Sequence, residues 1–184
     1  KKLRMIIVVD FGSQTSHLIA RRIKELGVET KIVHPHDTFS IALKDKPKGI
    51  ILSGGPASVY EENSPIIKKS IYELGIPILG ICYGFQLTTK LLGGKVVSGK
   101  KEYGPAILKM TNGEWQMVNK LPKQFTVWMS HGDEVIKLPK GFEVFGSTEH
   151  VSFALAGDLK RNIYGLQFHP EVEHTEFGNQ ILKN

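Results

Sequence analysis

A single cysteine, Cys82, is the only thiol in this sequence of 184 residues, so an internal disulfide is excluded. One unpaired cysteine is typical of a reducing compartment, and we expect a cytoplasmic protein. The sequence also lacks an apolar run near the roughly 20 residues that a membrane-spanning helix needs. Its apolar start at Met5 is broken by Asp10, and no small-residue cleavage site follows. Residues 5–9 are therefore interpreted as a buried strand and not as a signal peptide.

A dense run of positive charge is missing as well. The net charge is +6, but the Lys and Arg residues are scattered, with no basic stripe and no interleaved aromatic residues. A nucleic-acid partner is therefore disfavoured. The sequence has neither repeats nor low-complexity linkers, and its length suits one domain with a sizeable core.

Apolar strands alternate with helices in the first half of the chain. The pattern predicts strands at 5–9, 30–33, 49–52 and 76–81, and helices at 16–26, 64–74 and 85–92. Strands that are apolar throughout indicate a parallel sheet with both faces covered. We therefore expect an α/β fold with an open, mostly parallel, flavodoxin-like sheet flanked by helices.

Short strand-like runs separated by Gly, Asn and Pro turns fill the second half. They lie at 95–97, 106–110, 126–130, 143–147, 151–156 and 162–168, and predict an additional small antiparallel sheet. A last helix is expected from about residue 176 to the end. From the length we expect a single domain over residues 1–184. Because the last helix runs to Asn184 and no initiator Met is present, we also expect it to be cut at its C-terminus or to be the smaller part of a two-part enzyme.

The lone cysteine lies where a strand turns into a helix, with Gly80 and Gly84 two residues to either side. This is the spacing of a nucleophile elbow, whose tight turn leaves no room for neighbouring side chains. The helix that follows favours a thiolate through its positive end. Backbone N–H groups of Tyr83 and of Gly55, on a second Gly-rich turn, are candidate oxyanion donors. An inert buried cysteine and a phosphate turn are the alternatives, but no Gly-Lys-Ser/Thr follows either turn.

A thiol nucleophile needs a base, and the sequence offers seven histidines. His169 closes an apolar strand and is followed by Pro170 and Glu171. Residues two apart in an extended segment project to the same side, so Glu171 can orient the His169 imidazole. His131 is a rival base, and Asp133 stands two residues after it.

Together these motifs resemble the class I, or triad-type, glutamine amidotransferases. Three blocks carry the resemblance: Leu52-Ser53-Gly54-Gly55-Pro56, Gly80-Ile81-Cys82-Tyr83-Gly84-Phe85-Gln86 and Gln167-Phe168-His169-Pro170-Glu171. They occur in the family's order and at its spacing. The resemblance implies that Cys82 attacks the side-chain amide of glutamine while Gly55 and Tyr83 hold the oxyanion. His169, oriented by Glu171, then protonates the ammonia and activates water.

The same resemblance implies four substrate contacts. Gln86 lies one helical turn after the nucleophile, so its side-chain amide is expected to reach the substrate. The alternative is that Gln86 lies on the helix surface without a role in binding. Ser130, Gly132 and Asp133 are expected to meet the amino and carboxyl groups of glutamine. No metal ligand is expected among the site residues.

Further blocks resemble the branch of the family that serves GMP synthesis. They are Asp10-Phe11-Gly12-Ser13-Gln14, Pro56-Ala57-Ser58-Val59-Tyr60, Glu102-Tyr103-Gly104, Trp128-Met129-Ser130-His131-Gly132-Asp133 and His174-Thr175-Glu176. The last block is a candidate for docking a partner, with a loop and helix cap as the alternative. Two departures, Thr15-Ser16-His17 and Pro105, are expected near a partner surface and away from the triad.

A glutaminase of this branch implies a synthetase partner. Ammonia in neutral water is mostly protonated, so the family docks the glutaminase onto a second domain. By resemblance this is an ATP pyrophosphatase domain or subunit that converts XMP to GMP. We expect no cofactor in this domain, with ATP and magnesium on the partner. Two alternatives stay open: a glutaminase for anthranilate, carbamoyl phosphate or CTP synthesis, and a non-catalytic binding module on the same fold.

Overall fold

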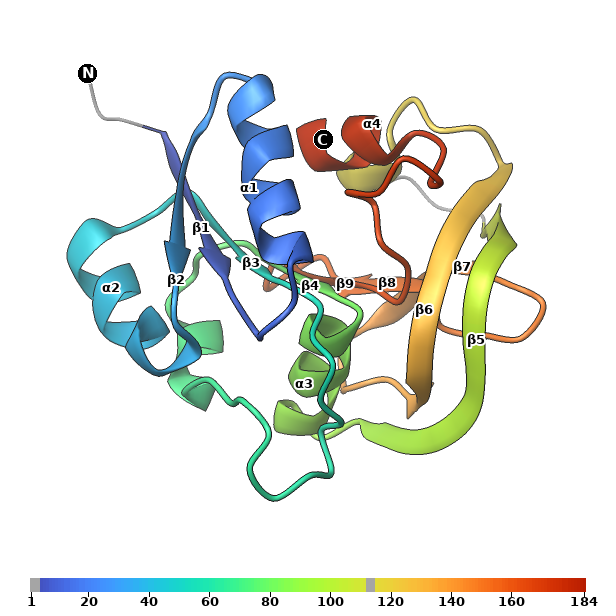
Figure 1. Ribbon diagram of the computed structural model, residues 1–184, viewed down its shortest axis with the longest axis horizontal. Helices are drawn as coiled ribbons and strands as arrows, with labels where there is room; N and C mark the ends of the chain where they lie inside the picture. Colours follow the sequence, from blue (N-terminus) through green and yellow to red (C-terminus); the bar gives the residue numbers. More distant parts are fainter. Residues whose placement is uncertain (1–3, 112–114) are drawn as a thin grey trace.

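The computed structural model describes residues 4–111 and 115–184. Its strands are Met5–Val9 (β1), Glu29–Val33 (β2), Gly49–Leu52 (β3), Ile78–Ile81 (β4), Lys95–Met110 (β5), Gln124–Lys137 (β6), Glu143–Ser147 (β7), Leu155–Asp158 (β8) and Ile163–Leu166 (β9). They form one mixed sheet in the order β2-β1-β3-β4-β9-β8-β7-β5-β6 (Figure 1). The strands from β2 to β9 in this order are parallel, and the remaining pairs are antiparallel.

Helices cover both faces of the parallel part of the sheet. Their bounds are Thr15–Glu25 (α1), Thr38–Asp45 (α2), Tyr83–Leu91 (α3) and Gly178–Lys183 (α4). Helices α1 and α4 lie side by side and contribute Ile19 and Ile181 to one core cluster (Figure 1). Helices α2 and α3 contribute Ala42 and Phe85 to the other cluster. Strand β1 serves both, because Val8 faces the first cluster and its neighbours face the second.

The predicted α/β fold is confirmed, including the parallel strands of the first half and the antiparallel strands of the second. Strands β8 and β9 pair with each other and β9 pairs with β4, so the antiparallel strands continue the parallel ones in a single sheet. They do not form the additional small sheet that was predicted. None of the helices in the described part of the chain has the length and apolar content that crossing a membrane demands.

The helix predicted over 64–74 is wrong. Residues Lys69–Glu73 form a short 3-10 helix (η2), and Lys68 before it is extended, with a ψ of 125°. The side chains of Ile67 and Ile71, whose spacing suggested a helix, are both buried in the core. The spacing therefore reflects burial of two apolar side chains and not a continuous helix.

Several boundaries also differ from the predictions. The runs predicted at 95–97 and 106–110 are the two ends of one long strand, β5. The strand predicted at 151–156 begins only at Leu155 and continues to Asp158. Helix α2 was not predicted; it follows a 3-10 turn at Pro35–Asp37 (η1) and buries Thr38 and Ala42.

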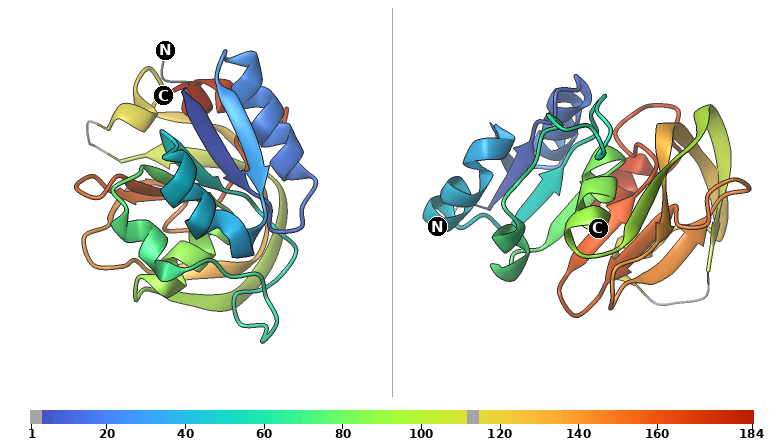
Figure 2. Two further views of the ribbon diagram at one scale, coloured as in Figure 1. Left: turned by 90° about the vertical axis from the view of Figure 1, so that its left-hand side faces the viewer. Right: turned by 90° about the horizontal axis from the view of Figure 1, so that it is seen from below.

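Strands β5 and β6 form a long antiparallel ribbon at the end of the sheet opposite β2 (Figure 2). The free edge of β6 is covered by the chain that follows β9. The N–H of His169 donates to the carbonyl of Trp128 at 3.1 Å, and the N–H of Glu176 donates to that of Thr126 at 2.9 Å. The edge strand is thus protected by a segment that also carries the predicted base.

Glycine at position 165 lets α3 pack directly on β9. A Cβ added there would overlap the ring of Phe85, which is fully buried. We expect Gly165→Ala to lower the free energy of unfolding by about 1–3 kcal/mol, because a buried ring has no space to move into. Urea unfolding measures the loss.

Gly132→Ala is the matched control, because its added Cβ would lie 3.6 Å from the nearest atom, in the side chain of Lys101. This variant should stay within about 0.5 kcal/mol of the wild type. Equal stability of the two variants would contradict the packing argument.

Candidate active site

Three neighbouring parallel strands, β3, β4 and β9, end at the same edge of the sheet. Leu52 pairs with Gly80, and Ile81 pairs with Leu166. The residues that follow these ends are therefore neighbours in space. In open parallel sheets this edge is where ligands bind. It holds both Gly-rich turns and the segment that leads to His169.

The bend at Cys82 is sharp and strained. Its φ is 51° and its ψ is −107°, a conformation that residues with a side chain rarely adopt. Helix α3 begins at the next residue, Tyr83. A Cβ on Gly80 would lie 2.7 Å from the backbone of Gly84, and a Cβ on Gly84 would collide with the carbonyl oxygen of Leu52. Both glycines are thus required by close backbone approach, as their spacing predicts.

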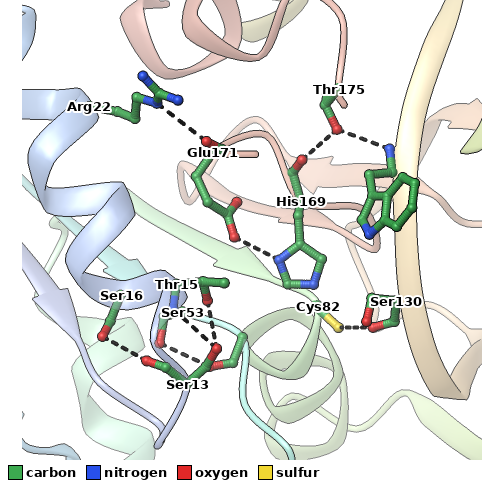
Figure 3. A network of polar contacts seen from close by, with 12 residues as sticks. Ser13, Thr15, Ser16, Arg22, Ser53, Cys82, Ser130, His169, Glu171 and Thr175 are labelled. Atoms are coloured by element: carbon green, nitrogen blue, oxygen red, sulfur yellow. Dashed lines mark hydrogen bonds and ion pairs between the residues drawn. The ribbon is translucent and has the colours of Figure 1, made fainter. Parts of the chain in front are cut away.

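The sulfur of Cys82 has three polar neighbours. Its S–H donates to the carbonyl oxygen of Ser130 at 3.4 Å, and Nε2 of Gln167 donates to the sulfur at 3.6 Å. The His169 imidazole faces the sulfur (Figure 3), and a Cβ placed on Gly54 would lie 2.9 Å from Cε1 of His169 and 3.7 Å from Cβ of Cys82. The first N–H groups of α3 have no acceptor within the helix, so the helix terminus favours negative charge here.

Glu171 holds the other side of the imidazole. Its Oε1 lies 2.7 Å from Nδ1 of His169 (Figure 3), and its side chain is buried. Since a carboxylate only accepts, Nδ1 carries the proton and Nε2 is left for the sulfur. The backbone carbonyl of Glu171 accepts from Nε of Arg22 on α1 at 3.3 Å, which ties this loop to the helix.

The pKa of the His169 imidazole reflects these contacts. Burial alone lowers it, but the hydrogen bonds to Cys82 and Glu171 and the charges of both groups raise it from 6.5 to about 10. The ring is therefore held as an imidazolium. An imidazolium beside a cysteine favours a reactive thiol over an inert one.

A cleft of about 400 Å³ opens beside the sulfur. Among the predicted site residues, Gly55, Cys82, Ser130 and His169 line it. Its other walls come from Gly12, Ser13, Thr15, Pro56, Trp128 and Val172. Tyr83 buries its ring against Phe11 and presents only its backbone near the bend. The cleft thus brings the candidate nucleophile, base and one oxyanion donor to one surface.

Three predicted substrate residues lie apart from the cleft walls. Within the described part of the chain, Gln86, Gly132 and Asp133 are not among its lining residues. Gln86 is buried and donates to the backbone carbonyl of Asp133 at 3.0 Å. The Asp133 carboxylate accepts from the hydroxyl of Ser58 at 2.5 Å. The side chains of Gln86 and Asp133 are thus engaged in hydrogen bonds within the protein.

His131 has both ring nitrogens occupied. Nδ1 lies 3.0 Å from the carbonyl oxygen of Asp133, and Nε2 lies 2.9 Å from Oε2 of Glu102 on the paired strand β5. Its carboxylate partner comes from across the ribbon, where sequence spacing does not reveal it. With both nitrogens engaged, this ring fits a structural role better than that of a base.

The departures from the family pattern lie in different places. Thr15 lines the cleft beside the nucleophile, closer to the chemistry than expected. His17 on α1 and Pro105 on β5 are exposed. In the predicted docking block, Thr175 is buried and hydrogen-bonded, whereas His174 is exposed and its ring stacks on that of Trp128 at 4.6 Å.

Two residues were not predicted from sequence to contact the nucleophile or the base. Gln167 belongs to the Gln-Phe-His-Pro-Glu block, and its position at the end of β9 could have marked it as a neighbour of Cys82. Thr175 contacts the backbone of His169 from six residues further along. Across the described residues no group of three or more His, Cys, Asp or Glu side chains is arranged to hold a metal ion.

Comparison with known proteins places this site in a family. The family model for "Glutamine amidotransferase class-I" matches residues 7–184. The chain therefore belongs to the class-I glutamine amidotransferase family, as its motifs indicate.

Individual members of the family and solved structures are also similar to this chain. GMP synthase (glutamine-hydrolyzing) from Staphylococcus aureus strain JH9 is 54% identical over 186 residues, which cover 100% of this chain and 36% of that protein. The chain thus spans about a third of the length of the curated relatives it matches. Among solved structures, a protein from Thermoplasma acidophilum assigned as one subunit of a GMP synthase has a TM-score of 0.87 at 36% identity, covering 98% of this chain and 91% of its own. A glutamine amidotransferase from Thermotoga maritima shares the fold, with a TM-score of 0.75 at 22% identity and coverage of 92% and 76%.

The raised pKa of His169 makes stability depend on pH. Since the folded pKa of about 10 exceeds the reference value of 6.5, the protonated ring stabilises the folded state fully below pH 6.5, and this contribution is lost as the pH rises through about 10. Glu171→Gln keeps the shape but removes the charge, and so lowers the folded pKa of His169. We expect the wild type to exceed this variant in stability by more at about pH 6 than at about pH 10. Urea unfolding at both pH values measures the difference.

Glu173→Gln, a charge removal at an exposed neighbour, is the control and should show no such pH trend. A stability difference for Glu171→Gln that stays constant between the two pH values would refute this electrostatic account.

Proposed function

We propose that this chain hydrolyses glutamine to glutamate and ammonia through a thioester on Cys82. The observation that carries the proposal is that the strained Cys82, just before α3, lines one cleft with an imidazole that Glu171 holds at 2.7 Å. The site therefore provides a nucleophile, a base and a carboxylate that orients the base. Membership of the class-I glutamine amidotransferase family supports the choice of glutamine as substrate.

The proposed reaction uses each group in turn. The Cys82 thiolate attacks the side-chain amide carbon, and the N–H groups of Gly55 and Tyr83 hold the resulting oxyanion. His169 gives a proton to the departing ammonia, and then takes one from the water that hydrolyses the γ-glutamyl thioester. Each oxyanion donor should contribute roughly 3 kcal/mol to lowering the barrier.

Substrate recognition is proposed for Gln86, Ser130, Gly132 and Asp133. Ser130 lies on the cleft wall, and the other three would act from behind it. Gln86 donates to the carbonyl of Asp133, so it would fix the backbone that presents the recognition groups. The Asp133 carboxylate would pair with the substrate ammonium once Ser58 releases it.

We further propose that the ammonia serves a synthetase that converts XMP to GMP. The 54% identity to a GMP synthase supports this choice, as does the likeness to the Thermoplasma acidophilum structure. Residues 1–184 would form one glutaminase domain, working with an ATP pyrophosphatase domain or subunit that binds ATP and magnesium. No cofactor is proposed for the glutaminase itself. A cytoplasmic location fits an active site that depends on a reduced cysteine.

Chemical trapping tests the nucleophile. We expect a glutamine analogue with a thiol-reactive group to modify the wild type once per chain and to stop glutamate release. Because the chain has one cysteine, intact-mass spectrometry assigns the site without ambiguity. Cys82→Ala should take up no label and release no glutamate above background.

Two controls separate chemistry from folding. Excess glutamine should slow the labelling of the wild type, because substrate and analogue compete for one cleft. Circular dichroism of Cys82→Ala should match the wild type. Glutamate release by Cys82→Ala at the wild-type rate would end the proposal.

Coupling to the partner gives a separate prediction. We expect slow glutamate release by the isolated chain and faster release when the ATP pyrophosphatase, XMP and ATP are added, because docking orders the oxyanion turn. An anthranilate or carbamoyl phosphate synthetase partner should have no such effect. Equal turnover with and without the GMP-forming partner would contradict the coupling.

A further inference from the structure

The hydroxyl of Thr175 bridges the predicted base to strand β6. It accepts from the N–H of Trp128 at 2.9 Å and donates to the carbonyl oxygen of His169 at 2.6 Å (Figure 3). The N–H of His169 in turn donates to the carbonyl of Trp128 at 3.1 Å. Both backbone polar groups of His169 are therefore bonded, directly or through one hydroxyl, to a single residue of the ribbon.

We propose that Thr175 is a positioning residue, whose hydroxyl fixes the His169 backbone so that the imidazole stays over the Cys82 sulfur. This inference rests on the proposed function, in which His169 is the base. A residue that only ended a turn would bond within its own loop, as the N–H of Thr175 does to the carbonyl of Val172. The Thr175 hydroxyl also reaches a strand 47 residues away and so joins the backbone of His169 to β6.

The ring needs this support because the space around it is narrow. A Cβ on Gly54 would lie 2.9 Å from Cε1 of His169, so the ring already touches the turn after β3. Glu171 fixes Nδ1 but sits on the same short segment and would move with it. Strand β6 supplies an anchor outside that segment. A shift of the His169 backbone by about 1 Å would separate imidazole and sulfur, which typically costs on the order of a hundredfold in rate.

Substitutions at position 175 test the hydroxyl. Thr175→Val keeps the shape and removes the two hydrogen bonds, whereas Thr175→Ser keeps them. We expect Thr175→Val to lower kcat for glutamate release by on the order of a hundredfold, with KM changed by less than about threefold. Thr175→Ser should stay within about threefold of the wild type.

A second measurement does not depend on glutamine. Alkylation by iodoacetamide reports the reactivity of the single cysteine directly. We expect Thr175→Val to slow alkylation at neutral pH by about tenfold, because a displaced imidazolium supports less thiolate. Thr175→Ser should react like the wild type. A wild type that alkylates rapidly but never hydrolyses glutamine would end the proposed function while leaving the role of Thr175 testable.

Thr38→Val is the matched control. Thr38 is also buried, at the start of α2, and its hydroxyl also donates to a backbone carbonyl, that of His34 at 3.1 Å. This variant should lose stability as Thr175→Val does, yet keep wild-type alkylation. Thr175→Ala removes the hydroxyl without putting a methyl group in its place. It provides a second test if the valine variant folds poorly.

The outcomes distinguish a role of Thr175 in positioning His169 from a role in fold stability alone. Slow alkylation in folded Thr175→Val or Thr175→Ala, with rescue by Thr175→Ser, supports the inference. Wild-type alkylation in the folded valine or alanine variant would overturn it, and so would a serine variant as slow as the valine variant. Unfolding of both Thr175→Val and Thr175→Ala would assign the hydroxyl to fold stability and would also overturn it.

Discussion

The common edge at which β3, β4 and β9 end is the constraint on which the rest of the structure depends. Their register places Gly80 beside Leu52 and Leu166 beside Ile81. Every group of the proposed triad and oxyanion hole follows one of these ends within a few residues. Because the strands are held by ladders of hydrogen bonds within the core, the spacing of nucleophile, base and oxyanion turn is set by the sheet and not by flexible loops.

The two halves of the chain contribute differently to this edge. The parallel half supplies the bend at Cys82 and the helix behind it. The antiparallel half supplies the ribbon against which the segment after β9 rests, through bonds from Thr126 and Trp128. The ribbon therefore serves as a support for the base as well as a cover for the core.

Sequence patterns predicted contacts between residues that are close in the chain and missed contacts between segments that are far apart in the chain. The elbow around Cys82 and the pair His169–Glu171 could be predicted because their partners lie within a few residues. The engagement of Gln86 with Asp133 and of Thr175 with Trp128 could not, because each joins segments 47 residues apart. The false helix over 64–74 has the same origin: Ile67 and Ile71 are buried by the tertiary fold, and extended backbone at Lys68 satisfies their spacing equally well.

The positive φ of Cys82 also carries an energetic cost. A side chain in that conformation costs on the order of 1–3 kcal/mol, which glycine at position 82 would avoid. Glycine would relieve this strain but would remove the single thiol of the sequence. The bend therefore holds a residue that backbone geometry alone would not select, and the proposed role of the sulfur accounts for it.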